Sequence, residues 1–295
     1  MVYKSFGRTC FNLFNYIFLI LTSLICVLPF INLLAVSFSQ GAAVSAGSVT
    51  FWPIDFTTKA YEFAIANGKF LKALFISTER VVLGVSINLL LMIITAYPLS
   101  KTKEKVAGRN IYMVFFVITM LINGGLIPTY LVVVKTHLIN SIWALILPGA
   151  LPVYNMLILM NFLRGLPEEL EEAAFIDGAG PFQVLGKILL PVLKPALATV
   201  GLFCIVGHWN SWFDGVIYMN DTSKLPLQSY LQTLLQNFDQ IMQKSGTDYA
   251  KLLSMMNART GRAAQLFLGA VPIMLIYPFL QKYFTKGLVL GSVKG

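Results

Sequence analysis

Residues 164–191 read RGLPEELEEAAFIDGAGPFQVLGKILLP, a charged stretch inside an otherwise apolar chain. Pro167 suits the first turn of a helix, and the acidic residues after it favour a helix start because the helix dipole stabilises negative charge there. Asp177 and Gly178 end this pattern, since glycine tolerates the left-handed conformation that closes many helices. The stretch therefore predicts a short amphipathic helix, a turn, and a second helix that runs to Pro191.

The composition is that of a membrane protein. Hydrophobic residues make up 57% of the 295 residues, charged residues only 12%, and the mean hydropathy is +0.73. Soluble domains carry about 25% charged residues. Six segments approach the roughly 20 apolar residues that a bilayer-spanning helix needs. They cover residues 11–37, 76–99, 111–134, 142–163, 192–213 and 263–284. We expect one all-α integral membrane domain over 1–295, with about six transmembrane helices.

The net charge of +9 reflects orientation in a lipid bilayer rather than binding to nucleic acid, because the basic residues cluster at the borders of the apolar segments. Short loops rich in lysine and arginine stay on the cytoplasmic side. The chain should therefore be multi-pass, with both termini and the 164–191 loop in the cytoplasm and residues 40–75 and 214–262 outside. The basic residues that set this orientation are Lys4, Arg8, Lys101, Lys103, Lys105, Arg109, Arg164, Lys187, Lys194, Lys282, Lys286 and Lys294.

The spacing in the charged stretch resembles the EAA loop of binding-protein-dependent ATP-binding-cassette permeases. In that family the loop docks onto the ATPase, so the resemblance implies that the stretch is a cytoplasmic coupling helix. The alternative is a solvated acidic loop whose match is due to chance. The residues that the resemblance assigns to coupling are Glu172, Ala173, Ala174, Asp177, Gly178, Ile188 and Pro191.

Four further tracts resemble the second permease of carbohydrate importers, in the branch that takes up oligosaccharides or polysaccharide fragments. They are GGLIP at 124–128, HWNSWFD at 208–214, PLQ at 226–228 and KGLVLGSVKG at 286–295. The resemblance implies the type I importer fold in a bacterial cell membrane. It also implies a heterodimer with a homologous first permease, two ATPase subunits, and an external solute-binding protein or lipoprotein that delivers an oligosaccharide.

No ATP site is present in the sequence, which lacks the pattern Gly-x-x-x-x-Gly-Lys-Ser/Thr. We therefore expect no cofactor in this chain, with ATP and Mg²⁺ bound by partner ATPases. Enzyme activity is not expected, because His137 and His208 are the only histidines and form no metal or acid–base constellation. A proton-coupled secondary transporter is the alternative, but such proteins carry ionisable groups in mid-span. Here Glu79 and Arg80 lie near one end of a segment.

The candidates for a sugar path lie at the outer end of the fifth segment and inside the third. Trp209 and Trp212, with Asn210 and Asp214, combine flat apolar faces and hydrogen-bonding groups that suit sugar rings. The alternative is an aromatic belt at the membrane interface, where tryptophan is enriched. Asn123 lies among glycine and proline and predicts a broken helix that lines a cavity. Hydrogen bonding to another helix is its alternative.

The second outer segment, residues 214–262, extends towards the bound solute-binding protein in the relatives that the chain resembles. Four of its residues are our candidates for contact with that protein: Tyr218, Leu227, Gln228 and Tyr230.

Overall fold

The computed structural model describes residues 6–66, 68–233 and 258–292, and every regular element in these ranges is helical. This agrees with the predicted all-α class. The chain divides into two compact units, one made of residues 1–70 and 233–271 and the other of residues 71–232 and 272–295. The division passes through two helices, α4 (Lys69–Ser100) and α16 (Ala258–Ser292). The prediction of one domain over 1–295 stays a prediction.

The first unit contains α1 (Phe6–Ser37), α2 (Gly41–Ser45) and α3 (Lys59–Ala66), together with the first part of α16. The most apolar stretch of 18 residues in α1 has a mean hydropathy of 2.6, and none of these residues is buried. A helix that is apolar all round is stable only where lipid or protein covers it. Its length and composition therefore agree with the first predicted span.

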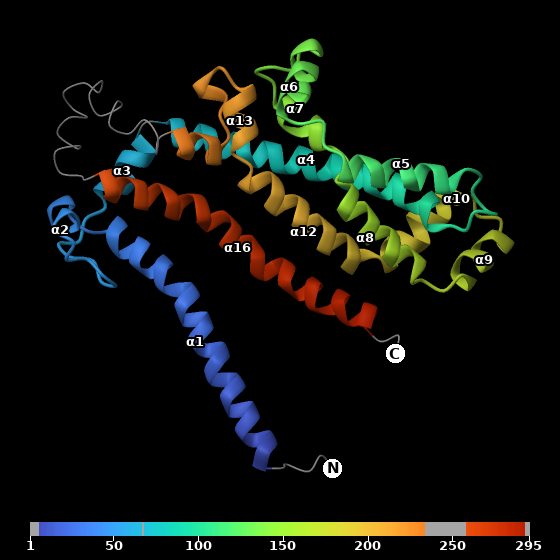
Figure 1. Ribbon diagram of the computed structural model, residues 1–295, viewed down its shortest axis with the longest axis horizontal. Coiled ribbons are helices and arrows are strands. Elements are labelled where there is room, and N and C mark those ends of the chain that lie inside the picture. Colours follow the sequence, from blue (N-terminus) through green and yellow to red (C-terminus); the bar gives the residue numbers. More distant parts are fainter. Residues whose placement is uncertain (1–5, 67, 234–257, 293–295) are drawn as a thin grey trace. The chain divides into compact units, whose positions relative to one another are not determined.

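The second unit holds the remaining elements (Figure 1). After α4 they are α5 (Arg109–Leu121), α6 (Leu126–Lys135), α7 (Ile142–Ile146), η1 (Leu147–Gly149), α8 (Val153–Arg164), α9 (Glu169–Ile176), α10 (Pro181–Gln183), η2 (Val184–Leu189), α11 (Leu190–Val192), α12 (Lys194–Asn210), α13 (Phe213–Tyr218) and η3 (Thr222–Lys224). Helix α8 packs against both α5 and α12. Side chains from α4, α8, η2 and α12 form the core, where Met92, Met156, Leu189 and Val200 are fully buried.

Three of the predicted spans are bent. Among the described residues two helices, α1 and α4, are long and apolar enough to cross a membrane alone, and up to five spans result if each bent pair counts as one. The pairs are Arg109–Leu121 with Leu126–Lys135 at 110°, Ile142–Gly149 with Val153–Arg164 at 52°, and Pro181–Val192 with Lys194–Asn210 at 82°. The sixth predicted segment, 263–284, lies within α16.

The sharpest bend lies where the sequence predicted a broken helix. Gly125 has a φ of +87°, which side chains with a Cβ rarely adopt. The Asn123 side-chain oxygen accepts a hydrogen bond from the Gly125 N–H at 2.8 Å. This bond satisfies a backbone group that the break releases, which matters because an unpaired N–H in an apolar medium is costly. The broken helix is thus confirmed, whereas its place beside a cavity stays a prediction.

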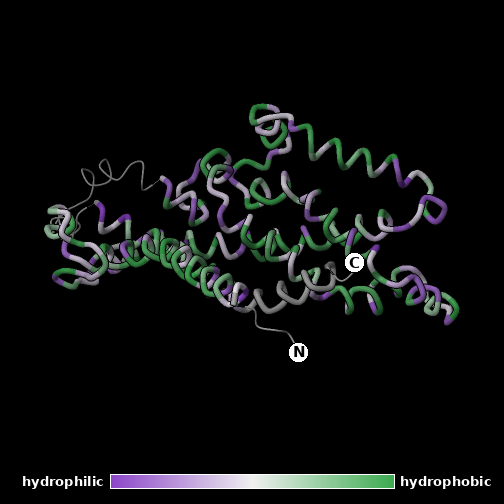
Figure 2. The backbone as a smooth tube through the Cα atoms, turned by 60° about the horizontal axis from the view of Figure 1, so that its bottom comes forward, coloured by the Kyte–Doolittle hydropathy of each residue, from purple (hydrophilic) through white to green (hydrophobic). Residues whose placement is uncertain are grey.

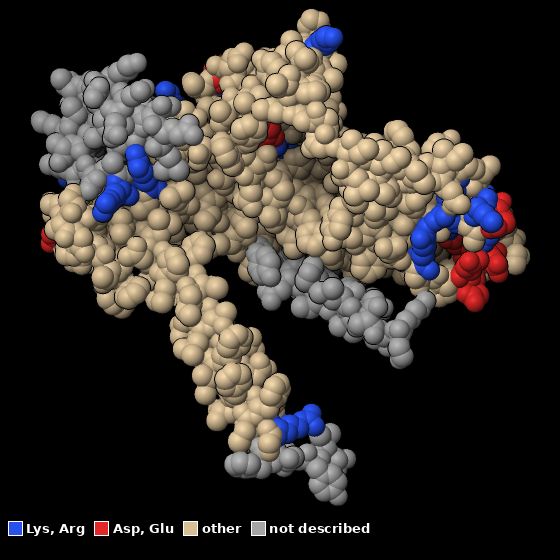
Figure 3. Space-filling view, in the orientation of Figure 1, with Lys and Arg blue, Asp and Glu red and all other residues tan. Residues whose placement is uncertain are grey.

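Apolar and charged residues lie in different parts of the fold. Hydrophobic residues predominate along the helices in Figure 2, and hydrophilic residues gather in the connections. Figure 3 shows lysine, arginine, aspartate and glutamate side chains crowded together at the end of the second unit where α9 lies. The remaining visible surface of that unit is largely uncharged, as expected for a protein whose sides face lipid.

Candidate functional site

Helix α9 forms where the acidic stretch predicted it. Its bounds are Glu169–Ile176, and its first turn carries Glu169, Glu171 and Glu172. No side chain caps the free N–H groups at this end, since the cap residue Glu168 makes no such hydrogen bond. The negative charges instead stabilise the positive end of the helix dipole.

The end of α9 is a Schellman turn built on one glycine. The Gly178 N–H donates to the Phe175 carbonyl at 3.0 Å, and the Ala179 N–H donates to the Ala174 carbonyl at 2.9 Å. Gly178 has a φ of +81°, and an added Cβ there would meet no atom within 4 Å. The backbone conformation, rather than space, therefore requires glycine at this position. Asp177 is the residue that ends the helix, as predicted.

The two predicted alanines lie on different faces of α9. Ala174 is 6% exposed and joins the core of the second unit, whereas Ala173 and Glu172 are exposed. Two large apolar side chains that follow them in the chain, Ile176 at the end of α9 and Phe182 in α10, are each 86% exposed. An apolar surface next to an acidic one is typical of a protein-binding site rather than of a solvated loop. This observation favours the coupling interpretation.

The second predicted helix is present but irregular. It consists of α10, the π-helical η2 and α11, and Ile188 is half-buried against the core. Pro191 is exposed and lies two residues after Leu189, the last residue of η2. Because proline has no N–H, it cannot give the hydrogen bond that an α-helix needs at this point, which accounts for a locally wider turn. The chain then bends into α12.

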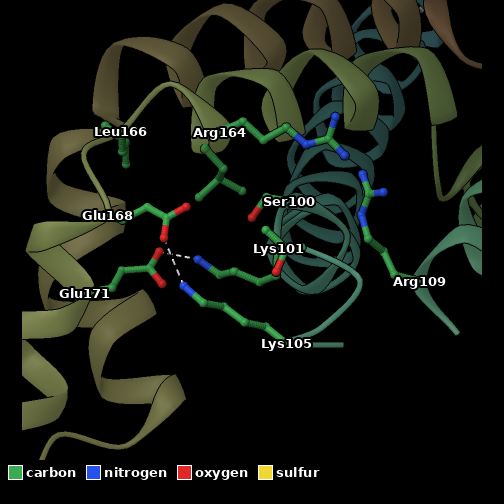
Figure 4. Close-up of a pocket in the computed structure, with 10 residues that line it drawn as sticks. Ser100, Lys101, Lys105, Arg109, Arg164, Leu166, Glu168 and Glu171 are labelled. Atoms are coloured by element: carbon green, nitrogen blue, oxygen red, sulfur yellow. Dashed lines mark hydrogen bonds and ion pairs between the residues drawn. The ribbon is translucent and has the colours of Figure 1, made fainter. Parts of the chain in front are cut away.

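Two ion pairs connect α9 to the chain that follows α4 (Figure 4). Lys101 pairs with Glu171, and Lys105 pairs with Glu168 at 3.0 Å. The hydrogen bond that Lys105 donates to the Glu168 carboxylate raises the pKa of Lys105 above its usual value. In the sequence, both lysines indicated only the orientation of the chain in the membrane. Their pairing with α9 was missed because the partners lie 70 and 63 residues apart.

Two arginines meet at the same end of α4. Arg109 Nε donates to the Leu99 carbonyl at 3.0 Å, and Arg164 Nη2 donates to the same oxygen at 3.2 Å. This oxygen lies in the last turn of α4, where the helix dipole favours positive charge. Together with the ion pairs, the arginines line a cavity of about 330 Å³ beside α9.

A second polar cluster lies deep among the apolar helices of the second unit. Arg80 on α4 is 3% exposed and forms a bidentate pair with Asp214, in which Nη1 donates to Oδ1 at 3.1 Å and Nη2 donates to Oδ2. Asp214 also accepts from the Ser211 hydroxyl at 2.9 Å and from the Gly215 N–H at 2.8 Å. Asp214 was predicted on the sugar path, but its carboxylate is used within the chain.

The same cluster extends along α4. Asn88 is 2% exposed, and its Nδ2 donates to the carbonyls of Gly149 and Ala150 at 3.0 and 2.7 Å. These carbonyls lie at the bend before α8. Since the amide nitrogen is the donor, its oxygen accepts from His208 Nε2 at 2.7 Å, which places the ring proton on Nε2. Arg80, Asn88, His208 and Asp214 line a cavity of about 400 Å³.

Gly84 allows the His208 ring to lie against α4. A Cβ at position 84 would lie 2.5 Å from His208 Nε2, closer than side chains tolerate. Gly84→Ala should therefore lower the free energy of unfolding by roughly 1–3 kcal/mol, because the ring is held by Asn88 and cannot turn away freely. Gly201→Ala is the matched control, since a Cβ there would meet Leu89 at an ordinary 3.9 Å. Equal melting temperatures of the two variants in detergent would contradict this reading.

The structure separates the other sugar-path candidates. Trp209 is 4% exposed and belongs to the packed interior, which corrects the prediction that it faces a sugar. Trp212 is 40% exposed and packs edge-on against Phe213. Asn210 and Asn123 are exposed. The three exposed residues stay candidates for the path.

The predicted contacts with a solute-binding protein are mostly buried within this chain. Leu227 is 0% exposed, and its N–H donates to the Ser77 hydroxyl at 2.7 Å. Tyr218 and Tyr230 are buried as well, so within this chain all three side chains pack in the interior. Gln228 is half-buried and stays a candidate. Residues 234–257 of the predicted outer segment lie outside the described residues.

Comparison with known proteins agrees with this geometry. The family model of the binding-protein-dependent transport system inner membrane component matches residues 1–289. The polygalacturonan/rhamnogalacturonan transport system permease protein YtcP of Bacillus subtilis is 38% identical, covering 97% of this chain and 98% of that protein. Protein LplC of the same organism is also 38% identical, over 98% of this chain and 96% of its own length.

A solved structure has the same architecture. A bacterial ABC transporter involved in the import of the acidic polysaccharide alginate contains a chain that matches with a TM-score of 0.86 and 29% identity. The match covers 96% of this chain and all of that one. The broken spans and the short helix α9 therefore belong to an architecture found in a solved transporter.

Proposed function

This chain belongs to the family of binding-protein-dependent transport system inner membrane components, and from that premise we propose that it is one of two homologous permease subunits of an oligosaccharide importer. Permeases of such importers work with ATPase subunits and a binding protein, and ATP hydrolysis lies on the partner subunits. In our proposal two ATPases bind ATP and Mg²⁺, and an external binding protein delivers the sugar. This chain supplies half of the membrane path.

The observation that carries the proposal is the outward face of α9. Glu172, Ala173 and Ile176 are exposed there, Phe182 is exposed on α10 just after the turn, and Ala174 packs the helix against the core. Such a helix fits a groove on a partner, because its apolar side chains lose contact with water on docking. We assign this face to the ATPase. The α9 end then lies in the cytoplasm with both termini, and the loop before α4 lies outside.

The mechanism is alternating access. ATP closes the two ATPase subunits, and their movement displaces α9 and the helices attached to it. A partner shifts such an equilibrium only through its different affinity for the two states. The loaded binding protein must therefore prefer the outward-open state, and the ATP-free ATPases must prefer the inward-open one.

The substrate class in the proposal is an oligosaccharide derived from a polysaccharide. Support comes from the names of the similar proteins, which concern polygalacturonan, rhamnogalacturonan and alginate. The exposed amide of Asn210 and the aromatic face of Trp212 are groups that bind sugar hydroxyls and ring faces. Both lie near the outer end of α12.

The test is uptake by the complete complex in proteoliposomes, with both permeases, the ATPases and the binding protein. Labelled acidic and neutral oligosaccharides should accumulate only when ATP is present inside the vesicles. A proton gradient alone should drive no uptake. ATP-independent uptake that follows the proton gradient would instead support the proton-coupled alternative, for which the comparisons offer no support.

The two tryptophans near the end of α12 provide a direct test of the sugar path. Trp212→Ala should lower uptake per inserted complex severalfold, because an exposed stacking face contributes about 1 kcal/mol or more to binding. Trp209→Ala should instead lower the amount of folded protein, because Trp209 is buried. The cavity left by its side chain should lower the free energy of unfolding by roughly 3–5 kcal/mol. Uptake normalised to inserted complex separates these outcomes. Unchanged normalised uptake in Trp212→Ala, Asn123→Ala and Asn210→Ala alike would exclude the proposed path.

A further inference from the structure

Helix α9 is attached to the rest of its unit in two different ways. Ala174 packs into the apolar core that also contains Val184, Leu185 and Leu189 of η2. One turn earlier on the same face, Glu171 pairs with Lys101, just after the end of α4. The apolar attachment is shared among several helices, since the same core also contains Met92 and Ala96 of α4 and side chains of α8 and α12. The ionic attachment connects α9 to the end of α4 alone.

The Lys101–Glu171 pair is shielded from water. Its side chains are 17% and 15% exposed, whereas those of the Lys105–Glu168 pair are 52% and 68% exposed. Exposed pairs contribute little because water and salt screen them, while partly buried pairs are screened much less. The Lys101 ammonium also lies 4.6 Å from the centre of the Tyr97 ring, so a cation–π contact fixes it to the last turn of α4. Of the two pairs, this one can transmit a displacement.

Lys101 directly follows the end of α4, which two arginines hold in place. The Leu99 carbonyl accepts from Arg109, at the start of α5, and from Arg164, at the end of α8. The ends of three spans thus meet beside Lys101, as Figure 4 shows. Helix α4 continues without a break from Lys69 to Ser100, a length of about 48 Å at 1.5 Å per residue. It also carries Arg80 and Asn88 of the polar cluster. A displacement at Lys101 therefore reaches the interior of the unit.

We infer that Lys101 and Glu171 are a positioning pair that makes α4 move with α9. The inference rests on the proposed function, in which the ATPases move α9. Without the pair, α9 still docks through its outward face and still pulls on α12 through η2. The end of α4 then follows α9 only through the shared apolar core, and it follows less closely. ATP hydrolysis continues in that case, but less sugar crosses the membrane for each ATP.

Charge reversal tests the pair in the complete complex in proteoliposomes. Lys101→Glu and Glu171→Lys should each lower uptake per ATP hydrolysed at least about fivefold, the lower range of coupling between sites. The double variant Lys101→Glu/Glu171→Lys re-forms the pair and should return this ratio to within about threefold of the wild type, as expected for directly interacting residues. Lys103→Glu is the matched control, because Lys103 is exposed on the same connection and forms no ion pair with the described residues.

The neutral variants Lys101→Gln and Glu171→Gln guard against failure to fold, since they leave no repulsive charge. Both should insert, bind the ATPases and show the same lowered ratio. A double reversal no better than the single reversals, or a normal ratio in the neutral variants, would overturn the inference. If the wild-type complex showed no ATP-dependent uptake, the proposed function would fail instead. The two failures are therefore distinguishable.

Discussion

Asp214→Asn should cost the folded protein about 3 kcal/mol or more, because it leaves the buried guanidinium of Arg80 without its counter-charge. Arg80 is 3% exposed, and its Nε has no hydrogen-bond partner among the described residues. Its guanidinium also donates to the carbonyls of Ser211 and Leu145, but Asp214 is the one described residue that supplies a negative charge to it. We expect a lower melting temperature in detergent and less inserted protein. Glu79→Gln is the matched control, since it removes a carboxylate next to Arg80 that forms no ion pair with the described part of the chain.

A double replacement separates the loss of a contact from the burden of a buried charge. Replacing both partners by apolar residues, as in Arg80→Leu/Asp214→Leu, should recover much of the stability that Asp214→Asn loses. The double variant also loses the hydrogen bonds from Arg80 to the Ser211 and Leu145 carbonyls and the one from the Gly215 N–H to Asp214. If it is as unstable as the single variant, these hydrogen bonds matter more than the charge. A melting temperature equal to that of the wild type in Asp214→Asn would show that the pair contributes little.

The pairing of Arg80 with Asp214 illustrates what sequence patterns omit. The length of the apolar runs predicted the segment that contains Arg80 and the one that ends just before Asp214, because a bilayer requires about 20 apolar residues in each span. It did not predict that residues 134 positions apart meet. Their pairing depends on how α4 crosses the end of α12, which depends in turn on the space left by Gly84 beside His208. Such contacts follow from tertiary packing rather than from local preference.

Helix α9 was predictable because its signals are local. Acidic residues favour a helix start, and Asp177 with Gly178 favours its end, so neither depends on distant parts of the chain. The broken helix at Gly125 was predictable for the same reason. The burial of Leu227 and Trp209 was not predictable from the sequence. A loop pattern and an aromatic motif do not indicate which side chains the rest of the chain packs against.

Gly178→Asp should abolish most ATP-dependent uptake while the protein still inserts into the membrane. The left-handed conformation of Gly178 costs roughly 1–2 kcal/mol for a residue with a Cβ, and the new carboxylate lies at the negative end of the α9 dipole. Both effects disturb the turn that aims the outward face of α9. We expect at least about a tenfold loss of uptake, which corresponds to 1.4 kcal/mol. Co-purification with the ATPases should fall in parallel.

Two further variants identify the cause of that loss. Gly178→Asn adds a side chain without charge, and asparagine tolerates the left-handed region better than most residues, so it should retain more uptake than Gly178→Asp. Gly186→Asp places the same charge on η2, where the glycine is exposed, its φ is not positive and a Cβ would meet no atom within 4 Å. That variant should transport nearly normally, because its turn is unchanged. Equal losses in Gly178→Asp and Gly186→Asp would mean that added charge near the ATPase, rather than the geometry of the α9 turn, disrupts coupling. Normal uptake and normal ATPase binding in Gly178→Asp would remove α9 from the coupling mechanism.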